Sequence, residues 1–151
     1  MSKIDEALVG VTALGFDTAP LIYFVERHSA YVDLVREFVQ HVDTGTVVGY
    51  SSTVTLTEVL TQPKQKGNIT VEQEYRALLL HSRNFTLLPI DTTIAERAAD
   101  LRARYRFRTP DALQIAAALV AGCQAFLTND ALLKRTAELR VLVLDDLRGL
   151  G

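Results

Sequence analysis

The sequence predicts an α/β fold, a three-layer α/β/α sandwich with a mainly parallel central sheet. Short apolar runs typical of buried strands alternate with longer segments whose apolar residues recur at helical spacing. The short runs are apolar on both faces, as strands are when helices cover both sides of a parallel sheet. The 151 residues, of which 48% are hydrophobic, are enough for one core, so we expect residues 1–151 to form a single domain.

In the first half of the chain, two predicted strands are each followed by a helical segment. The strand before Asp17 leads into Thr18, Ala19 and Pro20, which offer a turn and a helix start. The second strand leads into a threonine- and valine-rich segment around Glu58, where local propensity opposes a helix and tertiary context must override it. The expected ranges are helix 4–12, strand 14–16, helix 31–42, strand 46–50 and a helical segment through 60.

The second half continues the alternation after a polar turn expected at residues 63–68. Thr109 is the expected N-cap of a helix whose first residue is Pro110, and Gly122 ends that helix. Asn129 and Asp130 are expected to open a further helix after a buried strand. The expected ranges are helix 70–82, strand 86–90, helix 94–105, helix 109–121, strand 125–128 and strand 141–144.

Four acidic residues are placed where the ends of parallel strands would bring them together. Asp17 and Asp130 follow strands, Glu58 lies in the segment after another strand, and Asp111 falls in the first turn of a helix. In open parallel sheets, functional sites gather beyond the carboxyl ends of the strands. The sequence therefore predicts that these four carboxylates converge at one edge of the sheet.

A single acid at a helix start has an ordinary explanation, because it interacts favourably with the helix dipole by roughly 0.3–1 kcal/mol. Several acids gathered at one place are not explained in this way, because two like charges about 4 Å apart repel by roughly 4 kcal/mol at an effective dielectric constant near 20. A divalent cation removes that penalty, and an all-oxygen ligand set favours Mg²⁺ or Mn²⁺. Glu58 is the most informative of the four, because it interrupts an apolar stretch.

Four segments together resemble the PIN domain family, and within it the VapC-like toxin ribonucleases of toxin–antitoxin pairs. The segments are FDTAPLIYF at 16–24, SSTVTLTEVL at 51–60, RTPDALQIAAA at 108–118 and FLTND at 126–130. Each is short, but their combination and order are fairly specific. The resemblance implies that Asp17, Glu58, Asp111 and Asp130 are the catalytic residues that bind magnesium or manganese, supported by Thr18, Thr128 and Asn129.

The implied activity is metal-assisted hydrolysis of RNA phosphodiester bonds by an endoribonuclease. The resemblance also implies a small antitoxin protein as inhibitor and a homodimer as the working form. Arg108 and Arg106, just upstream of Asp111, could contact the RNA backbone, or could be solvated arginines at a helix end. The formal net charge of −2 counts mildly against a general polyanion binder, but not against a metal-bearing site.

Two other functions remain open at this point. A non-catalytic PIN-type module that binds protein or RNA would take up no metal. A phosphatase with Asp17 as nucleophile would resemble the haloacid dehalogenases, which have a second aspartate where Ala19 stands here, so this alternative ranks last.

No apolar stretch is long enough for a membrane span and no signal peptide is recognised, so we expect a cytoplasmic protein without membrane contact. The single cysteine, Cys123, is expected to be core filler, and the three histidines surface or helix-end residues.

Overall fold

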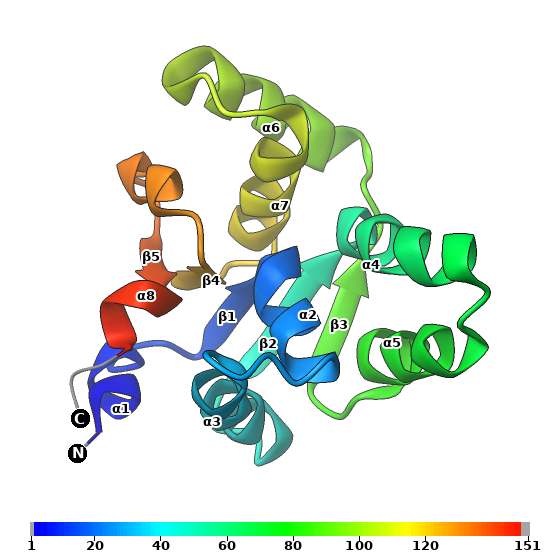
Figure 1. Ribbon diagram of the computed structural model, residues 1–151. Helices are drawn as coiled ribbons and strands as arrows, with labels where there is room; N and C mark the ends of the chain where they lie inside the picture. Colours follow the sequence, from blue (N-terminus) through cyan, green and yellow to red (C-terminus); the bar gives the residue numbers. More distant parts are fainter. Residues whose placement is uncertain (1, 149–151) are drawn as a thin grey trace.

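The computed structural model describes residues 2–148 and is built on a sheet of five parallel strands in the order β3-β2-β1-β4-β5 (Figure 1). With β1 in the centre, the chain first builds outward to one edge through β2 and β3 and then to the other through β4 and β5. The strands are β1 Ala13–Phe16, β2 Val48–Ser52, β3 Phe85–Leu88, β4 Ala125–Thr128 and β5 Arg140–Val143. The predicted parallel sheet is confirmed.

Helices cover both faces of this sheet, which confirms the three-layer α/β/α prediction. Because side chains alternate along a strand, Leu127 of β4 packs in the core with α2, α3 and α5, whereas its neighbour Phe126 packs in the core with α6 and α7. The helices of the first layer are α2 Thr18–Val25, α3 Val32–Asp43 and α5 Ile69–His81; those of the second are α6 Thr92–Tyr105 and α7 Thr109–Val120. The remaining elements are α1 Lys3–Ala7, α4 Thr53–Lys66, the short 3₁₀ helix η1 Ala131–Arg135 and α8 Leu144–Leu147.

A glycine in the central strand lets α7 lie close against the sheet. A Cβ atom at Gly15 would lie 2.7 Å from the Cβ of Ala118 and 2.9 Å from a ring carbon of Phe126. Both distances are shorter than real Cβ contacts, so no larger residue fits without moving the helix. The position of α7, and with it that of Asp111 in its first turn, is therefore set by a tight contact with β1.

The segment around Glu58 is helical despite its threonines and valines, as context was expected to require. The hydroxyl of Thr61 donates to the carbonyl of Thr57, one turn earlier, at 2.7 Å. The hydrogen bond of this β-branched side chain is therefore made within the helix. The turn predicted at 63–68 is wrong, because α4 passes through a buried Pro63 and ends only at Gly67, whose φ of 65° suits a left-handed helix end. The apolar burial of Pro63 outweighs its missing backbone donor.

Two further local predictions are corrected. The N-cap of α7 is Arg108, without a side-chain cap, and Thr109 is the first helical residue, so the fixed φ of Pro110 acts inside the first turn instead of at its start. The helix expected after Asp130 is the short 3₁₀ helix η1, because β5 begins soon after it. Over residues 2–148, no helix is both long enough and apolar enough to cross a membrane.

Candidate active site

The four acidic residues singled out from the sequence line one open pocket of about 330 Å³ at the carboxyl edge of the sheet. Asp17 follows β1, Asp130 follows β4, Glu58 lies inside α4, and Asp111 lies in the first turn of α7. Four segments far apart in the chain therefore meet here. The complete lining is Asp17, Thr18, Ala19, Ile22, Tyr23, Glu58, Arg108, Asp111, Thr128, Asn129 and Asp130.

Asp17 is held in place by hydrogen bonds to its carboxylate from two elements. The backbone N–H of Thr18 donates to Oδ1 at 2.9 Å, which makes Asp17 the N-cap of α2, and the hydroxyl of Thr128 donates to Oδ2 at 2.7 Å. Burial raises the pKa of Asp17, and the negative charges of Asp111 and Glu58 raise it further, while the two hydrogen bonds act in the opposite direction. The pocket is therefore unfavourable for the ionised form of Asp17 when no cation is bound.

Glu58 is held in place by a hydrogen bond from Thr18. The hydroxyl of Thr18 donates to Oε1 of Glu58 at 2.6 Å, and the hydroxyl oxygen of Thr18 accepts a hydrogen bond from Nε2 of Gln114 at 3.1 Å. A hydroxyl has a single proton to donate, and because Gln114 is a donor toward Thr18, that proton stays directed at Glu58. Gln114 thus orients Glu58 indirectly.

The Gln114 amide is itself fixed by a buried set of hydroxyl groups. Its Nε2 also donates to the hydroxyl of Thr55 at 2.6 Å, and its Oε1 accepts from the hydroxyl of Ser52 at 2.5 Å. Gln114, Ser52 and Thr55 are all buried, and no buried side-chain polar atom lacks a partner among the described residues. Gln114 was not among the site residues predicted from the sequence. Its signal was a lone amide on an alanine-rich helix, to be matched with the hydroxyls of residues 51–55.

Asp111 is paired with a neighbouring cation. Nε of Arg108 lies 3.0 Å from Oδ2 of Asp111, and Nη2 lies 3.4 Å from Oδ1, although 78% of the Arg108 side chain is exposed. This pair raises the pKa of Arg108, chiefly through the hydrogen bond to Asp111. Arg106, the other arginine expected to contact substrate, caps the end of α6 with a φ of 59° and is not among the residues that line the pocket.

The end of β4 and the loop after it also line the pocket, through Thr128, Asn129 and Asp130. Oδ1 of Asp130 accepts from the backbone N–H of Leu132 at 3.0 Å, so this acid caps η1, and its own N–H donates to the hydroxyl of Thr128 at 3.1 Å. The side chain of Asn129 donates to the hydroxyl of Tyr23 at 3.3 Å. Thr128, Asn129 and Asp130 therefore connect the acidic pocket to α2.

A model of the PIN domain family matches residues 16–139, a range that contains all four acids. The chain belongs to the PIN domain family. No curated protein matches the chain in sequence.

Three solved structures show how widely this PIN fold is shared. VapBC2 from Rickettsia felis, bound to a DNA fragment from its promoter, is 14% identical, with 87% of this chain and 98% of that chain covered and a TM-score of 0.67. A toxin–antitoxin complex from Klebsiella pneumoniae is 26% identical, with 87% and 96% covered and a TM-score of 0.64. DNA-bound VapBC from Salmonella typhimurium is 16% identical, with 89% and 98% covered and a TM-score of 0.65.

The carboxylate oxygens of this PIN domain suit a hard divalent cation as ligands, although each acid is at present bonded to other groups of the same chain. Carboxylate oxygens from four segments line one pocket, which is the ligand chemistry that Mg²⁺ and Mn²⁺ prefer. Over residues 2–148, however, no three His, Cys, Asp or Glu side chains converge closely enough to hold an ion as they stand. Asp17, Glu58, Asp111 and Asp130 would hold such an ion only with their carboxylates closer together, and Asp111 is at present paired with Arg108.

The raised pKa of Asp17 predicts a pH-dependent cost of folding for the metal-free protein. A carboxyl group whose pKa is higher in the folded than in the unfolded state costs no stability below the unfolded pKa, near 3.9, and destabilises the fold as the pH rises through both values. We therefore expect Asp17→Asn to raise the melting temperature near pH 7 in EDTA, with a gain that shrinks toward pH 4. Thermal unfolding from pH 4 to pH 8 measures this, with the exposed Asp100→Asn on α6 as control. A loss of stability that is equal at every pH would contradict it.

Proposed function

We propose that this PIN domain is a metal-dependent endoribonuclease that hydrolyses RNA phosphodiester bonds and serves as the toxin of a toxin–antitoxin pair. The observation that carries the proposal is the shared pocket of Asp17, Glu58, Asp111 and Asp130. A fold that needed these acids only as helix caps would have no reason to gather them against their mutual repulsion. Membership of the PIN family supports the same reaction class.

In this proposal, each side chain of the pocket has a defined task. A magnesium or manganese ion, when bound, supplies a Lewis acid that polarises a phosphate oxygen and lowers the pKa of a water molecule. The four carboxylates hold the ion, Thr128 orients Asp17, and Thr18 orients Glu58. Arg108, once released from Asp111, places its guanidinium beside the pocket, where it can bind a backbone phosphate of the RNA. Arg106 is proposed as a weaker backbone contact at the outer edge.

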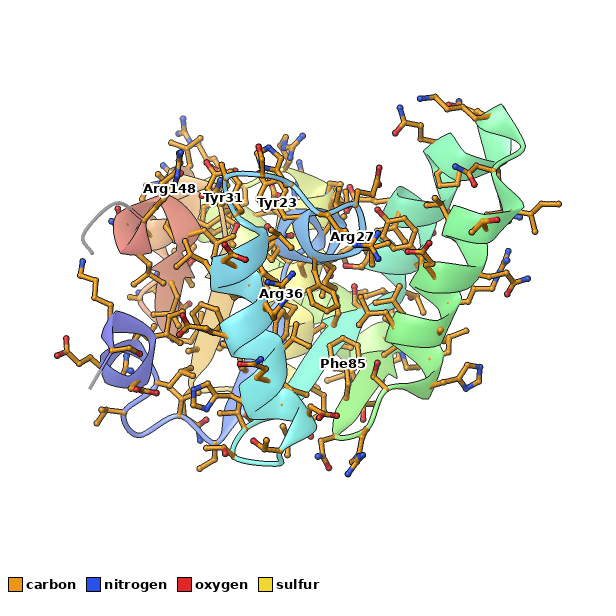
Figure 2. All side chains as sticks on the ribbon, turned by 60° about the horizontal axis from the view of Figure 1, so that its bottom comes forward. Tyr23, Arg27, Tyr31, Arg36, Phe85 and Arg148 are labelled. Atoms are coloured by element: carbon orange, nitrogen blue, oxygen red, sulfur yellow. The ribbon has the colours of Figure 1, made fainter. Side chains whose placement is uncertain are left out.

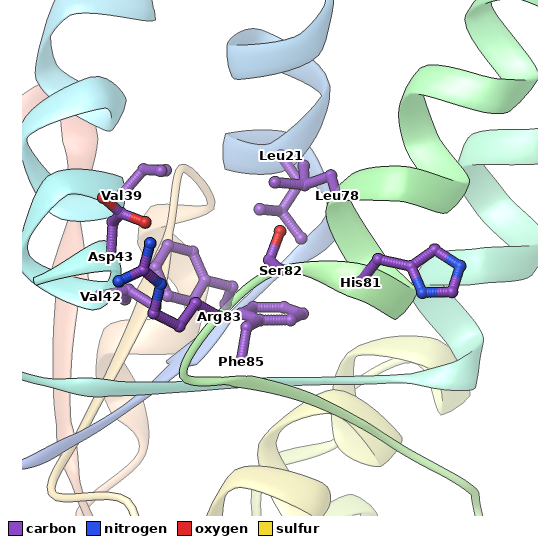
Figure 3. Close-up of a pocket in the computed structure, with 10 residues that line it drawn as sticks. Leu21, Val39, Val42, Asp43, Leu78, His81, Ser82, Arg83 and Phe85 are labelled. Carbon is purple, nitrogen blue, oxygen red and sulfur yellow. The ribbon is translucent and has the colours of Figure 1, made fainter. Parts of the chain in front are cut away.

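The partner proposed for this chain is a small antitoxin protein, because the solved structures that share its fold include toxin–antitoxin complexes. A groove between α3 and α5 offers a surface for it. The groove consists of two hollows of about 350 and 390 Å³ that share Leu78, and Figure 3 shows the first of them. Its apolar floor and sides include Phe16, Leu21, Phe24, Val25, Val39, Val42, Ala77 and Phe85.

The charges along this groove indicate what kind of segment fits it. Arg27, Arg36 and Arg83 line it, against the two acids Asp43 and Glu74. Figure 3 shows Arg83 and Asp43 on one side of the first hollow and Leu21 and Leu78 on the other, and Figure 2 shows Arg27 and Arg36 on the same face of the molecule. An antitoxin segment that carries apolar side chains flanked by acidic ones would complement this surface.

The rival function, a non-catalytic PIN module, is favoured by one observation, the ion pair that Asp111 makes with Arg108. A permanent pair would neutralise Asp111 and leave the pocket unable to take up metal. Calorimetric titration with Mn²⁺ separates the two functions, because only the nuclease requires metal binding that Asp17→Asn abolishes. The proposed homodimer is tested by sedimentation of the isolated chain.

For the proposed nuclease, we expect single-stranded RNA to be cleaved in the presence of Mg²⁺ or Mn²⁺ and not in EDTA. Asp17→Asn and Asp111→Asn each remove a negative ligand atom without changing side-chain size, so cleavage should fall by roughly 10²-fold or more. The control, Asp100→Asn, removes an exposed carboxylate on α6 outside the pocket and should leave cleavage unchanged. Equal cleavage by all three variants and the native chain would reject the assignment.

For the proposed partner, we expect a bulky side chain in the groove to prevent antitoxin binding. Ala77 is exposed and lines the groove, so Ala77→Trp fills the hollow without entering the core. Ala99→Trp places the same side chain on exposed α6, in the opposite layer, and serves as control. Each variant is co-expressed with a candidate small antitoxin protein that the native chain binds, and co-purification is measured. Retention of the partner by Ala77→Trp would exclude the groove as the docking site.

A further inference from the structure

The rim of the acidic pocket carries a cluster of aromatic rings that the proposed hydrolysis does not use. Tyr23 and Tyr31 stack with centroids 4.5 Å apart and planes 18° apart, and the ring of His28 lies 4.9 Å from the first and 5.0 Å from the second. The guanidinium of Arg148 lies 5.3 Å from the centre of the Tyr31 ring. Figure 2 shows Tyr23, Tyr31 and Arg148 next to one another. We call Tyr23, His28, Tyr31 and Arg148 the aromatic rim.

Hydrogen bonds join this aromatic rim directly to the acidic pocket. Tyr23 lines the pocket, and its hydroxyl accepts from Asn129, the residue between Thr128 and Asp130. The other end of the Asn129 amide accepts from the backbone N–H of Asp145, whose carboxylate in turn accepts from the hydroxyl of Tyr31. The rings are therefore held at a fixed position beside the acids, within reach of a nucleotide adjacent to a phosphate bound there.

His28 is the outermost ring and presents surface to solvent. It is exposed, whereas Tyr23 and Tyr31 are half-buried beneath it. It meets the two tyrosines at tilted angles of 58° and 43° and is not stacked parallel to either of them. Its Nδ1 accepts a hydrogen bond from the backbone N–H of Ala30 at 3.1 Å, so the neutral ring carries its proton on Nε2.

The overall charge indicates why the proposed nuclease would use such a surface. Proteins that bind nucleic acid mainly through phosphates carry clustered positive charge, whereas this chain has a net charge of −2 and an acidic pocket. Affinity must therefore come largely from the bases and the metal. Unpaired bases stack on aromatic rings and on arginine, and this contact tolerates any sequence because every base has a flat face.

We propose that the aromatic rim is a stacking platform for an unpaired RNA base next to the cleaved phosphodiester. The base lies on His28, which Tyr23 and Tyr31 support, and Arg148 contacts the strand beside it. This inference rests on the proposed nuclease function and specifies its substrate as single-stranded RNA. Duplex RNA, whose bases are stacked on one another, cannot use the platform.

The test measures binding of one fluorescent RNA as a single strand and as a duplex, by anisotropy, with Asp17→Asn present in every protein to prevent cleavage. We expect His28→Ala and Tyr31→Ala to weaken single-strand binding by roughly five- to hundredfold and to leave the weak duplex binding as it was. His81→Ala, which removes an exposed histidine at the end of α5, is the matched control. Tyr31→Phe keeps the ring and loses only the bond to Asp145, so it should bind nearly as well as the parent protein.

A second readout reports stacking itself when it is taken at protein concentrations that saturate RNA binding. An RNA that contains the fluorescent base 2-aminopurine should change its emission on binding to the parent protein, and this change should be absent with His28→Ala. Single-strand binding by His28→Ala equal to that of His81→Ala would overturn the proposal, as would equal losses for single strand and duplex. Loss of binding to the small partner protein with RNA binding intact would overturn it in favour of a protein contact. Failure of the nuclease proposal has a different signature, namely no cleavage by the native chain while rim-dependent RNA binding persists.

Discussion

The four carboxylates that line one pocket at the carboxyl edge of the parallel sheet are the constraint on which the proposed site depends. Two such charges about 4 Å apart repel by roughly 4 kcal/mol at an effective dielectric constant near 20. Each acid is accordingly given a partner from the protein: Thr128 and the α2 backbone for Asp17, Thr18 for Glu58, Arg108 for Asp111 and the η1 backbone for Asp130. These partners reduce the cost without removing it, since burial and the neighbouring charges still raise the pKa of Asp17. A divalent cation is the group that best offsets what remains.

The buried amide of Gln114 connects this edge to the packing of the whole domain. It lies on α7, which rests closely on Gly15 of the central strand, and it bonds to hydroxyls at the start of α4 and α2. Any shift of α7 would therefore reach Glu58 through Thr18. Hydroxyl groups suit this role because each can donate and accept, so one amide can organise several of them without a buried charge. The fold and the proposed metal site thus share the same interior contacts.

The parts of the structure that follow from local pattern could be predicted from the sequence. The alternation of apolar runs with amphipathic segments indicated the parallel sheet, and the position of Asp17 directly after a strand placed it at the carboxyl edge. Features that depend on tertiary packing could not be predicted in this way. Pro63 is a helix-breaking signal locally, but it is buried inside α4. The partners of Gln114 lie more than fifty residues away in the chain, and the pairing of Arg108 with Asp111 depends on how close the two side chains come.

The central claim, that the acidic pocket is built for a divalent cation, is tested most directly by anomalous diffraction from crystals grown with Mn²⁺. The account predicts an anomalous peak in the pocket, about 2.0–2.6 Å from carboxylate oxygens that include those of Asp17 and Asp111, with Arg108 moved away from Asp111. A pocket without a peak in excess Mn²⁺, with Arg108 and Asp111 still paired, would contradict it.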